Sequence, residues 1–192
     1  MKLIILDRDG VINQDRDDFV KSADEWIPIE GSMDAIAFLT QAGYTVAVAT
    51  NQSGIGRKYF TVQDLTEMHA KMHRLAVQAG GAIDGIWFCP HTAADNCDCR
   101  KPKPGMICDI LERFKADPAE TWLVGDSLRD LQAVDAAGGK PALVLTGKGK
   151  KTLSEHENEL PENTQIFDNL LAFSQYIMHE AAQDRADGQA NP

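Results

Sequence analysis

The sequence predicts a single α/β domain built on a doubly wound parallel sheet. Short apolar runs recur along the 192 residues, and each run is stopped by a polar or glycine-containing turn. Segments with the helical spacing of apolar residues lie between these runs. Strands that alternate with helices form parallel sheets covered on both faces. The length suits one domain, which we place at 1–182, with 183–192 as a disordered tail.

The first predicted strand, residues 2–6, leads directly into Asp7-Arg8-Asp9-Gly10. In open α/β sheets, ligands bind beyond the carboxyl ends of the strands. Side chains two apart in an extended segment point the same way, so Asp7 and Asp9 should face one pocket. Two adjacent carboxylates repel each other unless a cation or a shared proton relieves them. The pair therefore predicts a bound metal, with one carboxylate as nucleophile and the other as a proton-carrying acid.

The rest of the chain continues the alternation. Residues 11–30 are acidic and lack a period, and we interpret them as a loop that folds over the mouth of the pocket. Thr61 is predicted to be the N-cap of a helix that is closed by Gly80-Gly81. Further strands are predicted over 44–49, 83–88, 121–124 and 142–145, and further helices over 31–43, 105–114, 128–137 and 169–182.

Composition and charge exclude several classes of function. The net charge of −10 argues against coating nucleic acid or an anionic membrane, because either partner needs a basic face. No apolar stretch approaches the roughly 20 residues of a membrane span, and no signal peptide precedes the first strand. We therefore expect a cytoplasmic protein with no nucleic-acid or membrane partner. No apolar surface helix is left over, so we expect a monomer.

Four polar stations follow predicted strands or lie near them. They are Asp7 with Asp9, Thr50 with Asn51, the basic run 100–103, and Asp126 with Asp130. Taken singly, each has an ordinary structural explanation. The first could be a loop, the second a turn, the third a solvated basic patch, and Asp130 an exposed acid on a helix. Their order, spacing and position at strand ends together resemble the haloacid-dehalogenase superfamily of phosphohydrolases, over residues 1 to about 147.

The resemblance and the chemistry of phosphoryl transfer assign roles to these residues. Asp7 would attack phosphorus and form an aspartyl-phosphate. Asp9 would protonate the leaving alkoxide and then deprotonate the attacking water. The Thr50 hydroxyl and the Lys101 ammonium would stabilise the transferring phosphoryl group.

The same stations imply a catalytic Mg²⁺, which prefers hard oxygen ligands and water. Asp7, the backbone carbonyl of Asp9, and Asp126 would hold the ion. Asp130 lies one helical turn beyond Asp126 and could orient a metal-bound water. An EF-hand is disfavoured, because Gly10 stands at the wrong position of a calcium loop and a strand precedes it.

A second cluster, Cys89, His91, Cys97 and Cys99, matches a closed tetrahedral Zn²⁺ site. Nothing in this segment is periodic, so a structural metal is a natural organiser for it. The alternative is a set of reduced cysteines on a surface loop. Cys108 falls on the following helix, and we interpret it as core. Since Cys99 directly precedes the basic run, zinc would fix where those cations point.

Within the superfamily, CPH…CDCRKPKPGM together with LDRDGVIN and TNQSGI resembles the histidinol-phosphatase-like subgroup, which lacks a large cap domain. Members act on a heptose bisphosphate of the nucleotide-activated heptose pathway for surface polysaccharides, or on histidinol phosphate. A guanidinium beside the site favours an anionic distal group, and hence the phosphorylated sugar. The resemblance implies that substrate contacts come from Asp15, Asn51, Gln52, Ser53 and Arg100.

One departure concerns Ser127, which stands where some heptose enzymes carry a basic residue; Lys103 could compensate for the missing charge. Other classes of function remain open. A DNA 3′-phosphatase shares the catalytic core but needs a basic track for the backbone. A zinc-organised binding module without catalysis is expected to lack Asp7, Asp9 or Lys101, and all three are present.

Overall fold

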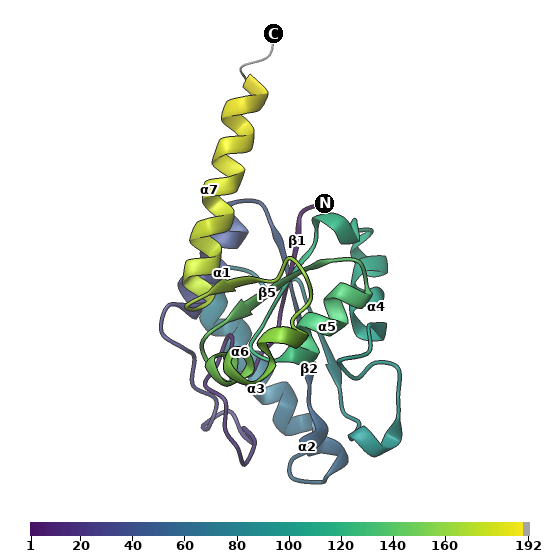
Figure 1. The fold of residues 1–192 in the computed structure, drawn as a ribbon. Coiled ribbons are helices and arrows are strands. Elements are labelled where there is room, and N and C mark those ends of the chain that lie inside the picture. The colour runs from purple at the N-terminus through teal and green to yellow at the C-terminus, as the bar shows by residue number, and fades with distance from the viewer. Residues whose placement is uncertain (190–192) are drawn as a thin grey trace.

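Within residues 1–189, which this computed structural model describes, the chain forms a six-stranded parallel sheet in the order β3-β2-β1-β4-β5-β6 (Figure 1). Side chains are described up to Gln183. The strands are β1 (Leu3–Leu6), β2 (Thr45–Asn51), β3 (Gly85–Cys89), β4 (Trp122–Gly125), β5 (Lys140–Val144) and β6 (Gln165–Phe167).

Helices follow the strands and cover both faces of the sheet, as the doubly wound class requires (Figure 1). No large cap domain is present among the described residues. The helices are α1 (Ser32–Gln41), α2 (Ser53–Gly56), α3 (Val62–Gln78), α4 (Gly105–Phe114), α5 (Leu128–Ala136), α6 (Gly149–His156) and α7 (Leu170–Gln189).

The alternation of side chains along β1 divides the core into two halves. Leu3 and Ile5 pack with residues of α4 and α5, whereas Ile4 and Leu6 pack with residues of α1, α3 and α7. Successive side chains of a strand point to opposite faces, so a strand buried on both sides must be apolar throughout. All four residues of β1 are fully buried, which explains its unbroken apolar run.

The strand order places the reaction-site loops together. From β1 the chain runs outward to β2 and β3, then returns to the other side of β1 to form β4. The loops after β1 and β4 therefore leave in opposite directions and open a crevice at the carboxyl ends of these strands. The backbone N–H of Asp7 donates to the carbonyl of Val124 at 2.9 Å, which joins the two strand ends.

Apart from the end of α7, the structure confirms the predicted strands and helices to within a few residues at their ends, including 105–114 and Thr61 as the N-cap of α3. Three elements were not predicted: α2, α6 and β6. The sequence of α6 carries few apolar residues, and β6 is a three-residue edge strand, so neither gives a periodic signal.

The last predicted helix is longer in the structure than expected. Helix α7 runs to Gln189, beyond the predicted end at Ala182 and into the segment expected to be a tail. The segment has no apolar stripe, so an apolar pattern does not register it as helix. Positions 190–192 lie outside the described residues. None of the described helices is long and apolar enough to span a membrane.

Candidate active site

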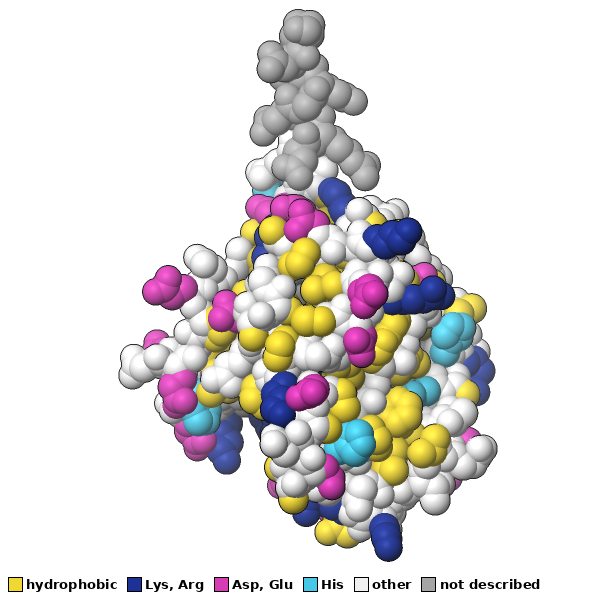
Figure 2. All heavy atoms as spheres, turned by 90° about the vertical axis from the view of Figure 1, so that its right-hand side faces the viewer, with side chains coloured by type: hydrophobic (Ala, Val, Ile, Leu, Met, Phe, Trp, Pro, Cys, Tyr) yellow, Lys and Arg dark blue, Asp and Glu magenta, His cyan; other side chains and the backbone are white. Residues whose placement is uncertain are grey.

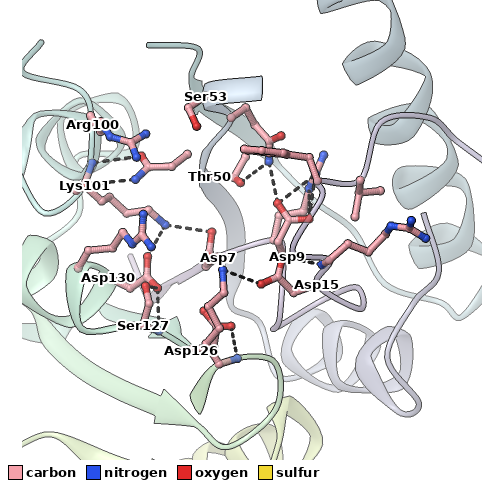
Figure 3. A pocket seen from close by; sticks show the side chains of 18 of the residues that line it. Asp7, Asp9, Asp15, Thr50, Ser53, Arg100, Lys101, Asp126, Ser127 and Asp130 are labelled. Atoms are coloured by element: carbon pink, nitrogen blue, oxygen red, sulfur yellow. Dashed lines mark hydrogen bonds and ion pairs between the residues drawn. The ribbon is translucent and has the colours of Figure 1, made fainter. Parts of the chain in front are cut away.

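A cavity of about 160 Å³ opens at the carboxyl ends of β1, β2 and β4 (Figure 3). The acidic loop after β1 supplies part of its wall, as the sequence predicted. The sequence-predicted site residues that line it are Asp7, Asp9, Asp15, Thr50, Asn51, Gln52, Ser53, Arg100, Lys101, Asp126 and Asp130.

A buried ammonium group at the centre of this cavity bridges two carboxylates. Lys101 is 1% exposed, and its Nζ lies 3.0 Å from Asp7 Oδ1 and 2.6 Å from Asp130 Oδ1 (Figure 3). It also donates to the carbonyl of Ala49 at 2.6 Å. Burial opposes the charge, but the carboxylates of Asp130 and Asp7 raise the pKa of Lys101 above its ordinary value. Lys101 is thus a fixed cation beside Asp7.

The carboxylates around Lys101 carry more negative charge than this one cation can neutralise. Burial and the charge of Asp130 raise the pKa of Asp7 to about 7, although Lys101 opposes the shift. Burial and the charges of Asp7 and Asp130 raise the pKa of Asp126 well above its ordinary value. Oxygens of these three carboxylates lie within 4.8 Å of one another. This donor set fits a hard divalent cation such as Mg²⁺.

Asp130, expected to face a metal-bound water, is instead engaged on both oxygens. Oδ1 pairs with Lys101, and Oδ2 accepts from the Ser127 backbone N–H at 3.1 Å and from its hydroxyl at 2.5 Å. The Ser127 contacts form the capping box at the N-terminus of α5. Asp130 therefore orients Lys101 and leaves Asp7 and Asp126 as the carboxylates with an oxygen free for an ion.

Two glycines allow the approach of Asp126 to this cluster. A Cβ atom on either Gly10 or Gly147 would collide with Asp126 Oδ2. Both glycines have positive φ, at 84° and 53°, which side chains rarely adopt. The same Oδ2 accepts from the backbone N–H of Lys148 at 2.8 Å. The loops after β1 and β5 thus close directly on this carboxylate.

Asp9 is clamped by three side chains. Arg8 Nη2 lies 2.8 Å from Asp9 Oδ1 and 3.0 Å from Oδ2, while Asn13 and Gln52 donate to the same carboxylate at 2.9 and 2.8 Å. Burial opposes ionisation, but the charge and hydrogen bonds of Arg8 lower the pKa of Asp9 below its ordinary value. The sequence analysis did not identify Arg8 as part of the site, although it stands between the two aspartates.

The residues at the end of β2 act mainly on their neighbours. Asn51 donates to the Lys101 carbonyl at 3.0 Å and accepts from the Lys101 N–H at 3.1 Å, so its amide holds that segment in place. Gln52 Nε2 donates to Thr50 Oγ1 and to Asp9, both at 2.8 Å. Both amides were expected to contact substrate, and the structure gives them these positioning contacts. Thr50 and Ser53 line the cavity.

The outer wall contains three cations that the sequence analysis missed, Arg16, Arg129 and Lys148. Lys148 Nζ pairs with Asp15 Oδ2 at 2.9 Å and thereby ties the loop after β1 to the loop after β5. Lys148 follows a predicted strand, which is the signal that could have found it. Lys103, expected to compensate at Ser127, instead contacts Asn96 and lies outside the cavity lining. That expectation was wrong, because the contact with Asn96 holds the Lys103 side chain against its own loop.

Residues 2–138 match the model of the haloacid dehalogenase-like hydrolase family. The chain belongs to this family. The match covers all the strands whose carboxyl ends form the cavity, from β1 to β4. It confirms the superfamily assignment made from the four polar stations.

Several relatives of this hydrolase have names that state an activity. The chain is 83% identical, over 97% of its own length and 100% of the relative, to a D-glycero-β-D-manno-heptose-1,7-bisphosphate 7-phosphatase of Neisseria meningitidis serogroup A. An enzyme of the same name from Bordetella bronchiseptica is 55% identical over 94% of the chain and 100% of the relative. The structure is similar to that of the B. bronchiseptica D,D-heptose 1,7-bisphosphate phosphatase complexed with magnesium and phosphate. The TM-score is 0.91, and the two sequences are 54% identical over 94% of this chain and 99% of the other.

The second predicted metal site of this hydrolase, Cys89, His91, Cys97 and Cys99, is assembled in the structure. Cys89 Sγ lies 3.6 Å from His91 Nδ1 and from Cys97 Sγ, and Cys99 Sγ lies 3.4 and 3.5 Å from the same two atoms. A zinc tetrahedron with ligand bonds of about 2.0–2.3 Å has edges of roughly 3.3–3.8 Å. The four donors therefore fit Zn²⁺ with no position left open. Cys108, expected in the core, is exposed on α4.

We expect this hydrolase, purified without chelators, to contain about one Zn²⁺ per chain. The Cys97→Ser variant should lose most of the metal, because one of four ligands is removed. The exposed Cys108 provides a matched control, since Cys108→Ser should keep the metal. Metal analysis by mass spectrometry measures both variants. A wild-type protein without zinc, or equal loss in the two variants, would contradict the site.

Magnesium is expected to stabilise this hydrolase more at about pH 8 than at about pH 5. The pKa of Asp7 is raised from 3.8 to about 7 in the native chain, so protons compete with the ion below pH 7. Without metal, the stability that protonated Asp7 contributes is lost as the pH rises through about 7. Added Mg²⁺ compensates in that range. The test is Tm with and without Mg²⁺ at both pH values; an equal shift at both would contradict this account.

Proposed function

We propose that this hydrolase removes the 7-phosphate of D-glycero-β-D-manno-heptose 1,7-bisphosphate. The observation that best supports a phosphatase is the buried Asp7–Lys101–Asp130 chain beside the clamped Asp9. It combines a nucleophile, a fixed cation and a proton-transfer group in one cavity. The relatives named for the heptose reaction extend along almost the whole chain, which supports this substrate and its β anomer.

In the first step, an Asp7 carboxylate oxygen attacks phosphorus, and the bond to the sugar oxygen breaks. Asp9 donates its proton to that oxygen, so the dephosphorylated sugar leaves as an alcohol. Thr50 and Lys101 stabilise the charge on the equatorial phosphoryl oxygens. Asp7, Asp126 and the backbone carbonyl of Asp9 would hold Mg²⁺, which would supply further positive charge beside the phosphoryl group.

In the second step, Asp9 removes a proton from water as that water attacks the aspartyl-phosphate. Inorganic phosphate leaves, and the Asp7 carboxylate is restored. The Arg8 clamp lowers the pKa of Asp9, which favours the ionised form that this step needs. An arriving phosphate dianion raises the pKa of a neighbouring carboxyl group, which favours the protonated form that the first step needs.

Recognition of the distal phosphate is assigned to Arg100. Its Nη1 donates to the carbonyl of His91 at 3.2 Å, and His91 is one of the four zinc donors. The zinc loop thus fixes the position of the guanidinium at the cavity wall, which gives the metal a link to substrate binding. Asp15, held by Lys148, is assigned to hydroxyl groups of the sugar.

The partner of this site is a small phosphorylated sugar. On the face shown in Figure 2, Lys and Arg side chains are scattered among acidic and apolar ones. The net charge of −10 favours a small substrate over the nucleic-acid backbone of a DNA 3′-phosphatase. We further propose that the protein acts as a monomer in the cytoplasm, in the synthesis of nucleotide-activated heptose.

Phosphorus NMR of the product tests this function directly. With heptose 1,7-bisphosphate and Mg²⁺, we expect the phosphomonoester resonance of position 7 to disappear while that of position 1 is retained. Inorganic phosphate should appear in equal amount. Loss of the position 1 resonance, or no release of phosphate, would contradict the proposed function.

A further inference from the structure

The cations that line the reaction cavity fall into two groups. Two of them, Arg100 and Arg129, have no carboxylate partner among the described residues. Such groups are free to bind an anionic ligand. The other four are each paired: Arg8 with Asp9, Arg16 with Asp18, Lys101 with Asp7 and Asp130, and Lys148 with Asp15.

Two features of its position disfavour a cation at Arg129. It lies in the first turn of α5, at the positive end of the helix dipole, where acidic side chains are the stabilising ones. It is also close enough to Lys148 for the two positive charges to repel. An anion bound at the guanidinium would offset both effects.

The two unpaired arginines flank one ion pair of the reaction site. Arg100 directly precedes Lys101, and Arg129 directly precedes Asp130. Lys101 Nζ lies 2.6 Å from Asp130 Oδ1, so this ion pair links the two segments that carry the guanidinium groups. Both arginines line the same cavity. Arg129 is therefore held within the range of a ligand whose reacting phosphate lies at Lys101.

There is room for a second anionic group beside Arg129. The side chains of Ser127, Arg129 and Lys148 line both the reaction cavity and an adjoining cavity of about 360 Å³. Ser127 is occupied in capping α5 through Asp130 and offers no positive charge. Arg129, two positions later, supplies a charge that Ser127 lacks.

We propose that Arg129 is a specificity-determining residue that binds the non-reacting phosphate of the bisphosphate, in addition to Arg100. This inference rests on the proposed function. A guanidinium presents two parallel N–H donors to a phosphate, which an exposed lysine cannot match. The residue thus explains how the chain manages without a basic side chain at Ser127.

The test compares two substrates that differ only in the distal phosphate, heptose 1,7-bisphosphate and heptose 7-phosphate. We expect the ratio of their kcat/KM values to fall roughly 10- to 100-fold in Arg129→Met, mainly through KM for the bisphosphate. Arg129→Lys should recover part of the ratio, because it restores the charge but not the paired donors. Arg113→Met removes an exposed arginine of α4 that lies outside the cavity, and should keep the wild-type ratio.

An unchanged ratio in Arg129→Met would overturn the assignment. An equal fall in Arg113→Met would also overturn it, because the effect would then come from net charge and not from a contact. If the wild-type protein fails to hydrolyse the bisphosphate at all, the proposed function itself is wrong. That result differs from an unchanged ratio of kcat/KM values, which can be measured only if the wild-type enzyme is active.

Discussion

Asp7→Asn is expected to reduce phosphate release by roughly 10⁴- to 10⁶-fold. The amide cannot form the acyl-phosphate bond, so the covalent step is lost. The fold should persist, because asparagine has the same shape as aspartate. Burial and the charge of Asp130 already raise the pKa of Asp7 to about 7, so the native chain accommodates a neutral group at this position.

The measurement pairs phosphate release in saturating Mg²⁺ with circular dichroism and Tm. Asp109→Asn makes the same chemical change on the exposed face of α4, and it should behave as wild type in both assays. An Asp7→Asn protein with near-normal turnover would refute the covalent mechanism. Loss of turnover together with loss of the fold would instead contradict the claim that Asp7 tolerates a neutral side chain.

Lys101→Met is expected to impair both catalysis and stability. Removal of a fixed charge that stabilises the transition state costs about 10²- to 10³-fold in kcat/KM. Removal of one partner of a buried ion pair costs about 3–5 kcal/mol of unfolding free energy, because the remaining charges are left unpaired. Here the carboxylates of Asp7 and Asp130 would lose a cation at 3.0 and 2.6 Å.

The double variant Lys101→Met with Asp130→Asn separates the two effects. Neutralising Asp130 removes one unpaired carboxylate, so part of the stability should return while activity stays low. Urea unfolding measures the first quantity and phosphate release the second. Full activity in Lys101→Met would contradict its role at the phosphoryl group. Wild-type stability in that variant would contradict the burial of the ion pair.

Much of the site could be predicted from local patterns in the sequence. Asp7, Thr50 and Asp126 each come within two residues of a predicted strand end, and parallel strands bring such ends to one edge of the sheet. The zinc donors lie within eleven positions of one another, so their spacing alone indicated a site. The structure confirms that each of these groups is brought together.

Contacts between distant segments could not be predicted from such local patterns. The positioning of Lys101 by Asn51 and Asp130 depends on three loops that meet only in the folded sheet. Arg129 lies within the station of Asp126 and Asp130, but it carries its charge at a helix end where a general rule expects acids. Lys148 follows a predicted strand, but nothing in the sequence pairs it with Asp15. These residues require distances, which spacing along the chain does not provide.

The competing substrate for this cavity is histidinol phosphate, which carries cationic groups where the heptose carries its second phosphate. Arg100 and Arg129, which have no carboxylate partner in the part of the chain that the structure describes, favour a distal anion. The decisive measurement is kcat/KM for heptose 1,7-bisphosphate and for histidinol phosphate, each with Mg²⁺. We expect a preference for the bisphosphate of about 100-fold or more, which corresponds to about 2.7 kcal/mol. A preference for histidinol phosphate would contradict the proposed function.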